Sequence, residues 1–156
     1  NVRSINVSLK SPVPIFIKIA PDLHNNNIIE ILNVCEENGV SGLIATNTTI
    51  SSKTLKNPTS FEGGLSGKQL FKPSNNILRL LAKKKNASTA LIGVGGIFSA
   101  TDIYEKIKMG ASAVQIYTSF VYNGPRHVKK MEVELKKLLL NDGYSTIDSA
   151  VGALLR

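Results

Sequence analysis

Two consecutive glycines, Gly95 and Gly96, lie where an apolar segment gives way to a helical pattern. The preceding residues 91–94 are typical of a buried strand. Glycine has no Cβ, so backbone N–H groups in such a turn can approach an anion closely, and the following helix N-terminus adds partial positive charge. The spacing therefore predicts a phosphate-binding turn. The same pair is also compatible with a turn that only satisfies backbone geometry.

Lys18 and Asn47 are polar side chains at the ends of two other apolar segments. In residues 15–19, alternation places Lys18 on a face that we expect to be buried. A buried ammonium group needs an anion, which is either a ligand or a carboxylate in a structural ion pair. Asn47 is expected either to bind a ligand or to form a turn or cap.

The sequence predicts four apolar strands that alternate with helices. These elements must position Lys18, Asn47 and the glycine pair. We predict strands around residues 15–19, 42–46, 91–94 and 113–117, each followed by polar or glycine residues. Helical spacing of apolar residues follows each strand, with the last long stripe at Val128, Met131, Leu135, Leu138 and Leu139. The polar segment between the second strand and Gly67 exceeds the usual connection length, which is typical of a functional loop.

Strands that are apolar on both faces and alternate with helices indicate a parallel α/β sheet, either doubly wound or part of a (β/α)8 barrel. Polar residues at the carboxyl ends of all four strands favour the barrel, with the last two strands as its phosphate site. Four strands form half a barrel, so we interpret residues 12–156 as about strands 5 to 8 and expect the N-terminal half as a partner. Residues 1–11 are expected to be a flexible loop or the remnant of an insertion.

Composition limits the alternatives. The 156 residues are 42% apolar and carry a net charge of +8, and no apolar run approaches the ~20 residues of a membrane helix. Lys83–Lys85 is expected to be a solvated helix end, and no aromatic residues interleave with basic ones, so we predict no nucleic-acid partner. Cys35 lies at a helical core position, and no metal site is predicted.

Five motifs occur in order along the chain: residues 16–23 (FIKIAPDL), 42–49 (GLIATNTT), 63–67 (GGLSG), 92–96 (IGVGG) and 110–118 (GASAVQIYT). Together they resemble the C-terminal half of a class 2, quinone-dependent dihydroorotate dehydrogenase. That family is an FMN-containing (β/α)8 barrel that oxidises dihydroorotate to orotate in pyrimidine synthesis and passes electrons to a quinone. The resemblance spans nearly the whole chain after Ser11.

The resemblance implies a role for each matching position. Asn47 and Thr48 would bind the substrate, and Val121 to Pro125 would lie near the quinone site. Residues expected to bind FMN are Lys18, at the N1/O2 edge of the flavin, Thr46 and Gly67, and, at its phosphate, Gly95, Gly96, Tyr117 and Thr118.

The catalytic base implied by the resemblance is a serine in the N-terminal half, so none is expected in this chain. Ser66, Ser99 and Ser119 are not assigned this role, and His24 and His127 have no catalytic role. We therefore expect no turnover from this chain alone.

The family also implies where the protein would lie and which electron acceptor it would use. The acceptor is ubiquinone, and membrane contact would come only through an N-terminal segment. The location is the mitochondrial inner membrane for a eukaryotic source. Two other functions stay open: a phosphate-binding barrel enzyme without flavin, and a non-catalytic half-barrel binding module.

Overall fold

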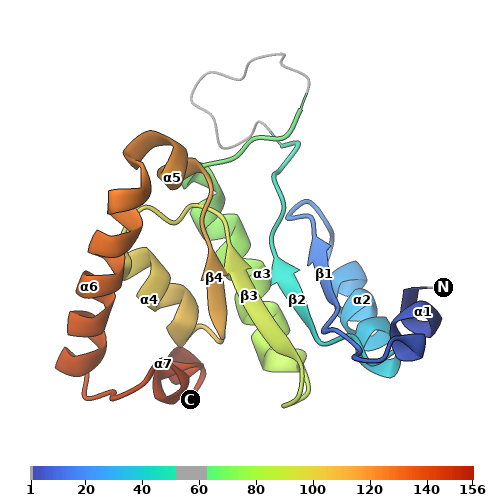
Figure 1. The fold of residues 1–156 in the computed structure, drawn as a ribbon. Helices are drawn as coiled ribbons and strands as arrows, with labels where there is room; N and C mark the ends of the chain where they lie inside the picture. The colour runs from blue at the N-terminus through green and yellow to red at the C-terminus, as the bar shows by residue number, and fades with distance from the viewer. Residues whose placement is uncertain (1, 52–62) are drawn as a thin grey trace.

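The computed structural model describes residues 2–51 and 63–156, which form a parallel sheet covered by helices (Figure 1). The strands are β1 (Phe16–Ile19), β2 (Gly42–Ala45), β3 (Ala90–Val94) and β4 (Ala113–Gln115), and they pair in the order β1-β2-β3-β4. All three pairs are parallel. The four predicted strands are therefore confirmed, although the last one ends at Gln115, two residues before its predicted end.

Helices connect the strands, as parallel pairing requires. The long helices are α2 (Asn25–Glu37), α3 (Phe71–Lys84), α4 (Ala100–Lys108) and α6 (Pro125–Asn141). The short elements are α1 (Val2–Ser8), η2 (Lys68–Leu70), α5 (Thr118–Asn123), α7 (Ile147–Ala150) and η3 (Ala153–Leu155). The unusually long connection predicted after β2 includes residues 52–62, which lie outside the described residues.

Two clusters of buried apolar side chains form the core. In the first, α2 and α3 pack on β1, β2 and β3 through residues such as Leu32, Leu43, Leu78 and Leu91. In the second, Ile103 and Ile107 of α4 pack against the apolar stripe of α6 and against α7. Met131, Leu135 and Leu139 of the stripe are buried as predicted, whereas Val128 is exposed.

The two faces of the sheet differ in their cover. Leu43 and Leu91 face the helices and are fully buried. Their neighbours Ile44 and Ile92, which point to the opposite face because side chains alternate along a strand, are only partly buried. Gln115 of β4 is exposed. The face away from the helices is therefore incompletely covered within the described part of the chain.

Residues 2–8 form a helix, so the prediction of a flexible loop is wrong for them. Val2, Ile5 and Leu9 have helical spacing and line a shallow apolar groove with Val13. The Asn6 side chain fixes this arrangement, because its Nδ2 donates to Val13 O (2.9 Å) and its Oδ1 accepts from Val13 N (3.0 Å). None of the residues in α1 is buried.

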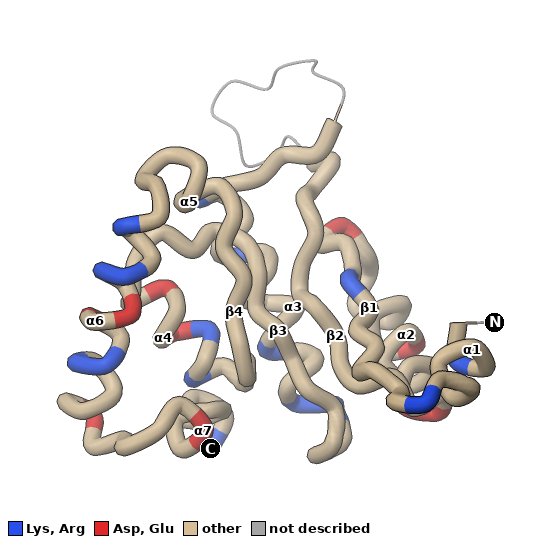
Figure 2. The backbone as a smooth tube through the Cα atoms, viewed as in Figure 1, with Lys and Arg blue, Asp and Glu red and all other residues tan. Residues whose placement is uncertain are grey.

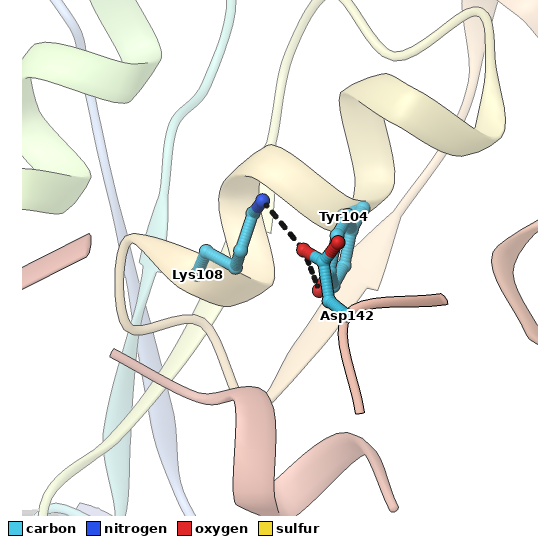
Figure 3. Close-up of polar contacts among 3 residues, drawn as sticks. All are labelled: Tyr104, Lys108 and Asp142. Carbon is cyan, nitrogen blue, oxygen red and sulfur yellow. Dashed lines mark hydrogen bonds and ion pairs between the residues drawn. The ribbon is translucent and has the colours of Figure 1, made fainter. Parts of the chain in front are cut away.

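A polar cluster joins α4 to the C-terminal end of α6 (Figure 3). The Tyr104 hydroxyl donates to Asp142 Oδ2 (2.7 Å), and Lys108 Nζ lies 3.4 Å from the same oxygen. Burial raises the pKa of Tyr104 well above its usual value, and the Tyr104 hydrogen bond lowers the pKa of Asp142. The cluster fixes the end of α6 beside α4.

Charged side chains lie on several helices. Figure 2 shows Lys and Arg along α6 with Asp and Glu between them. Lys129 Nζ and Glu132 Oε2 of this helix form an ion pair at 2.9 Å. Lys83 and Lys84 lie in the last turn of α3, where positive charge interacts favourably with the helix dipole. Within residues 2–51 and 63–156, no helix has the length and hydropathy needed to cross a membrane.

Candidate functional site

A cavity of about 340 Å³ opens at the carboxyl ends of the four strands. Parallel strands bring these ends to one edge of the sheet, so segments distant in sequence meet there. Its lining includes all nine residues predicted to bind cofactor or substrate: Lys18, Thr46, Asn47, Thr48, Gly67, Gly95, Gly96, Tyr117 and Thr118. The structure therefore brings these positions together, while their individual roles stay predictions.

The Gly95–Gly96 turn has backbone angles that favour glycine at both positions, with φ of +109° and +72°. The turn also packs closely on α3. A Cβ at Gly96 would lie 2.6 Å from Phe71 Cα, and one at Gly95 would lie 3.1 Å from Ser74 Oγ. Only glycines allow this close approach, which places the turn between α3 and the cavity.

The N-terminus of α4 contributes less to anion binding than the sequence suggested. The Asp102 carboxylate accepts hydrogen bonds from the backbone N–H groups of Phe98 (2.8 Å) and Ser99 (2.9 Å), and Ser99 Oγ accepts from Asp102 N (3.2 Å). This capping box already uses donors of the helix start and adds a negative charge. The glycine turn therefore stays the main predicted site for an anion.

Backbone hydrogen bonds between strand ends position residues 46–48. Thr46 N donates to Val94 O (3.1 Å), and Asn47 N donates to Ile19 O (2.7 Å). Thr46 is buried, whereas Asn47 and Thr48 are exposed at the cavity. Asn47 Oδ1 also accepts from Thr48 N (2.9 Å), which is the local turn interaction that the sequence left open.

Asp22 ties the end of β1 to the segment that follows β2. Its carboxylate accepts hydrogen bonds from Thr49 Oγ1 and from Ile50 N, the latter at 3.1 Å. Thr49 also pairs with Leu65 through backbone hydrogen bonds. These contacts fix the segment that carries Asn47 and Thr48.

Lys18 lines the cavity but is exposed, so the prediction of a buried ammonium is wrong for this chain. Among the described residues, β1 lies at the edge of the sheet and pairs only with β2. The face on which Lys18 lies is the one that no helix covers, which is the physical reason for its exposure.

The segment 64–67 and the start of α5 meet on the far side of the cavity. Thr118 Oγ1 donates to Ser66 Oγ (3.2 Å). A Cβ at Gly67, where φ is +100°, would lie 3.4 Å from Thr118 Cγ2. Gly67 and Thr118 are therefore neighbours, although 51 positions separate them in the sequence.

Ser119 provides an observation that tests whether a polar ligand fits. Its Oγ is buried at the cavity wall and has no hydrogen-bond partner within the described part of the chain. A buried hydroxyl without a partner costs free energy, about 1–3 kcal/mol. The unpartnered Ser119 hydroxyl and the two glycines line the same cavity, so the residues present fit a phosphorylated ligand, which carries oxygen acceptors.

Two residues predicted to lie near the quinone site are outside this cavity, and that role stays a prediction; a buried lysine was not singled out from the sequence. Val121 is exposed on α5 and Pro125 begins α6, and neither lines the cavity. Lys106 was missed: it is fully buried, and its side chain lies against Gly93 of β3, the strand that leads into the glycine turn. Its signal in the sequence is its helical spacing, because it falls on the same inward stripe as Ile103 and Ile107.

The sequence matches the family model described as dihydroorotate dehydrogenase over residues 4–139. The dihydroorotate dehydrogenase (quinone) of Helicobacter acinonychis is 47% identical over 143 residues, which cover 92% of this chain and 40% of that relative. The protein of the same name from Cereibacter sphaeroides is 42% identical over 152 residues, covering 97% of this chain and 43% of the relative. The chain thus spans about two fifths of the length of these curated relatives.

Solved structures agree with the sequence comparison. A dihydroorotate dehydrogenase of Eimeria tenella in complex with ferulenol superposes with a TM-score of 0.87 at 36% identity, covering 96% of this chain and 40% of that chain. The ligand-free form gives 0.84 at 37% identity, covering 93% and 41%. The predicted fold class, half of a (β/α)8 barrel, is confirmed.

Proposed function

This chain belongs to the dihydroorotate dehydrogenase family, and from that premise we propose that it is the C-terminal half of an enzyme that oxidises dihydroorotate to orotate in pyrimidine synthesis. The proposed cofactor is FMN, and the proposed electron acceptor is a quinone, ubiquinone in the first instance. The observation that carries the proposal is the meeting of nine predicted ligand-binding residues in one cavity. The names of the relatives, which include the word quinone, support the choice of acceptor.

FMN, when bound, supplies the group that accepts a hydride from the substrate. In the proposal, Gly95, Gly96, Tyr117 and Thr118 would hold its phosphate end through backbone N–H groups, because these four residues line the same cavity. Lys18, on the edge strand β1, would place a positive charge at the N1/O2 edge of the flavin, where it would stabilise negative charge on the reduced flavin. A fixed charge at such a point lowers the barrier without reorganisation.

Asn47 and Thr48 are proposed to bind dihydroorotate. An amide and a hydroxyl provide both donors and acceptors, which suit the ring carbonyl and N–H groups and the carboxylate of this substrate. Asp22 is proposed to hold their segment in place through Thr49 and Ile50. Correct orientation of the substrate is itself a large part of the catalytic effect.

The proton that leaves the substrate is proposed to go to a base outside this chain. None of the serines is proposed as that base: Ser66 Oγ accepts from Thr118, Ser99 Oγ caps α4 and does not line the cavity, and Ser119 Oγ is buried in the cavity wall. The proposal therefore includes no turnover by this chain alone.

The test uses the full-length protein that contains this chain. We expect a yellow protein that releases FMN on denaturation, loses its flavin absorbance when dihydroorotate is added without oxygen, and regains it with ubiquinone. If the flavin absorbance returned with fumarate or NAD⁺ and not with ubiquinone, the proposed acceptor would be wrong.

Two results would overturn the larger proposal. A protein without flavin would favour a different phosphate-binding barrel enzyme, and flavin that does not bleach would favour a non-catalytic binding module. A mitochondrial inner-membrane location, for a eukaryotic source, stays a prediction.

A further inference from the structure

Lys106 is a buried lysine for which the proposed reaction has no use. Its side chain is 0% exposed, on the inner face of α4. Its aliphatic part passes over Gly93 of β3, where an added Cβ would lie 3.0 Å from Lys106 Cδ. None of the ion pairs in residues 2–51 and 63–156 includes it. A buried charge without an ionic partner is costly, so its position calls for a physical reason.

Neutral groups of α3 hold the ammonium. Lys106 Nζ donates to Ser74 Oγ (2.7 Å) and to Asn75 Oδ1 (2.6 Å), and it lies 5.3 Å from the centre of the Phe71 ring. These residues belong to the first turns of α3, where the helix dipole is positive. The dipole therefore opposes the lysine. The Glu105 carboxylate, which accepts from Asn75 Nδ2 (3.1 Å), offsets this in part, and a further anion at the cavity would favour the arrangement.

The same contacts connect Lys106 to the glycine turn. Ser74 Oγ lies 3.3 Å from Gly95 O and 3.1 Å from Phe71 O, so its hydroxyl can donate to either carbonyl while it accepts from Lys106. A trans peptide is planar, with its C=O and N–H in opposite directions. Anchoring Gly95 O on Ser74 therefore turns the N–H of Gly96 away from Ser74.

We propose that Lys106 is a positioning residue for phosphate binding: through Ser74 it holds the Gly95–Gly96 turn in the conformation that binds the phosphate of FMN, and it supplies positive charge behind that turn. This inference rests on the proposed function. If Lys106 only packs in the core, its replacement should affect the binding of ligands with and without a phosphate equally. If it positions the phosphate-binding turn, only the phosphate-bearing ligand should bind more weakly.

The experiment measures binding of FMN and of riboflavin, which lacks the phosphate, to the flavin-free full-length protein by quenching of flavin fluorescence. Lys106→Met keeps the length of the side chain and removes the charge. We expect FMN to bind at least about tenfold more weakly, as for loss of a charge-assisted contact, with riboflavin binding nearly unchanged. Lys106→Arg should recover part of the FMN affinity.

Two further variants serve as controls. Ser74→Ala interrupts the link to Gly95 and leaves the lysine in place, so it should weaken FMN binding in the same direction. Lys108→Met removes a partly exposed lysine of the same helix that faces Tyr104 and should leave FMN binding unchanged. Melting temperatures without flavin show which variants fold, and Ser74→Ala carries the test if Lys106→Met does not.

The pH dependence gives a second readout. Burial lowers the pKa of Lys106 to about 8, while the negative charges of Glu105 and Asp102 oppose this shift. The residues of α3 and β3 that contact the lysine are uncharged. FMN affinity of the wild type should therefore fall above pH 8, whereas the permanently charged Lys106→Arg variant should lose this dependence.

The outcomes separate the two proposals. If wild-type protein binds FMN and Lys106→Met binds it equally well, or if FMN and riboflavin weaken by the same factor, this inference is wrong and the proposed function stands. If wild-type protein binds no FMN, the proposed function fails and the inference fails with it.

Discussion

Gly96 is the residue at which backbone geometry and packing constrain the site most tightly. Its φ of +72° already disfavours other residues, and an added Cβ would overlap the backbone of Phe71 at the start of α3. Gly143 provides a matched position, because its φ is +82° and an added Cβ would meet nothing within 4 Å. Substituting each glycine therefore distinguishes two costs: backbone strain alone at Gly143, and backbone strain together with steric overlap at Gly96.

We predict that Gly96→Ala destabilises the protein more than Gly143→Ala. Both variants carry the strain of a left-handed alanine, roughly 1–2 kcal/mol, and Gly96→Ala adds overpacking of about 1–3 kcal/mol. Urea unfolding of the full-length protein measures both. Gly96→Ala should also weaken FMN binding, whereas Gly143→Ala should not. Equal effects of the two substitutions on stability would contradict the close contact with α3.

At the scale of elements, Glu36 fixes the end of α2 to the turn between α3 and β3. Its Oε1 accepts from Asn86 N and from Thr89 Oγ1, both at 2.7 Å, and Thr89 is buried. This carboxylate thus holds the end of α2 to the turn that leads into β3, the strand that ends in the glycine turn.

Glu36→Ala is expected to lower the free energy of unfolding by about 1–3 kcal/mol, because it leaves a buried hydroxyl and a backbone N–H without their acceptor. Glu36→Gln retains an oxygen at the same place and should cost clearly less. Chemical denaturation compares the two variants. A loss in Glu36→Gln as large as in Glu36→Ala would mean that charge, and not the acceptor, is what matters.

The cluster at the end of α6 should make stability depend on pH. The Tyr104 hydrogen bond lowers the pKa of Asp142, so its contribution is present above the unfolded carboxyl pKa near 4 and is lost as the pH falls through the lower folded value. Tyr104→Phe is expected to destabilise the protein at pH 7 by more than at pH 3.

Melting curves at the two pH values measure this difference, and Tyr144→Phe controls for loss of a nearby tyrosine hydroxyl. A loss that is the same at both pH values would show that packing of Tyr104, rather than its bond to Asp142, stabilises the junction of α4 and α6.

At the scale of the whole molecule, one sheet face and two sheet edges have no partner among the described residues. β1 and β4 are the edge strands, and Ile44, Ile92 and Gln115 lie on the face that no helix covers. A closed barrel removes edges and fills its interior with such side chains. This chain covers about 40% of the solved relatives, so those proteins contain further chain that has no counterpart here.

We predict that this chain, produced alone, self-associates and binds a fluorescent hydrophobic dye, and that the complementary half of the barrel suppresses both. Light scattering and dye fluorescence measure the two effects. Ile92→Lys, on the uncovered face, should prevent the two halves from joining yet leave the helices folded by circular dichroism. Leu91→Lys, on the covered face, should unfold the chain. A monomeric chain that binds no dye would contradict the half-barrel arrangement.

The sequence by itself determined the order and type of the strands and long helices, and the positions where strands end in polar or glycine residues. Periodicity of two or 3.6 residues is a local property, so it is visible without a structure. Helix α1 was missed because its period is hard to recognise in so short a segment. Its apolar residues have helical spacing, but they are few and polar residues lie between them.

Only the tertiary structure decided which residues share the cavity and how deeply they are buried. Parallel pairing places the carboxyl ends of β1 to β4 at one edge of the sheet. Lys18 and Thr118 therefore line the same cavity, although 100 positions separate them in the sequence. Burial depends on what covers a face, so Lys18 is exposed on an edge strand, whereas Lys106 is enclosed because α3 packs over it. Alternation along a strand or helix predicts a face, but only long-range packing decides what that face contacts.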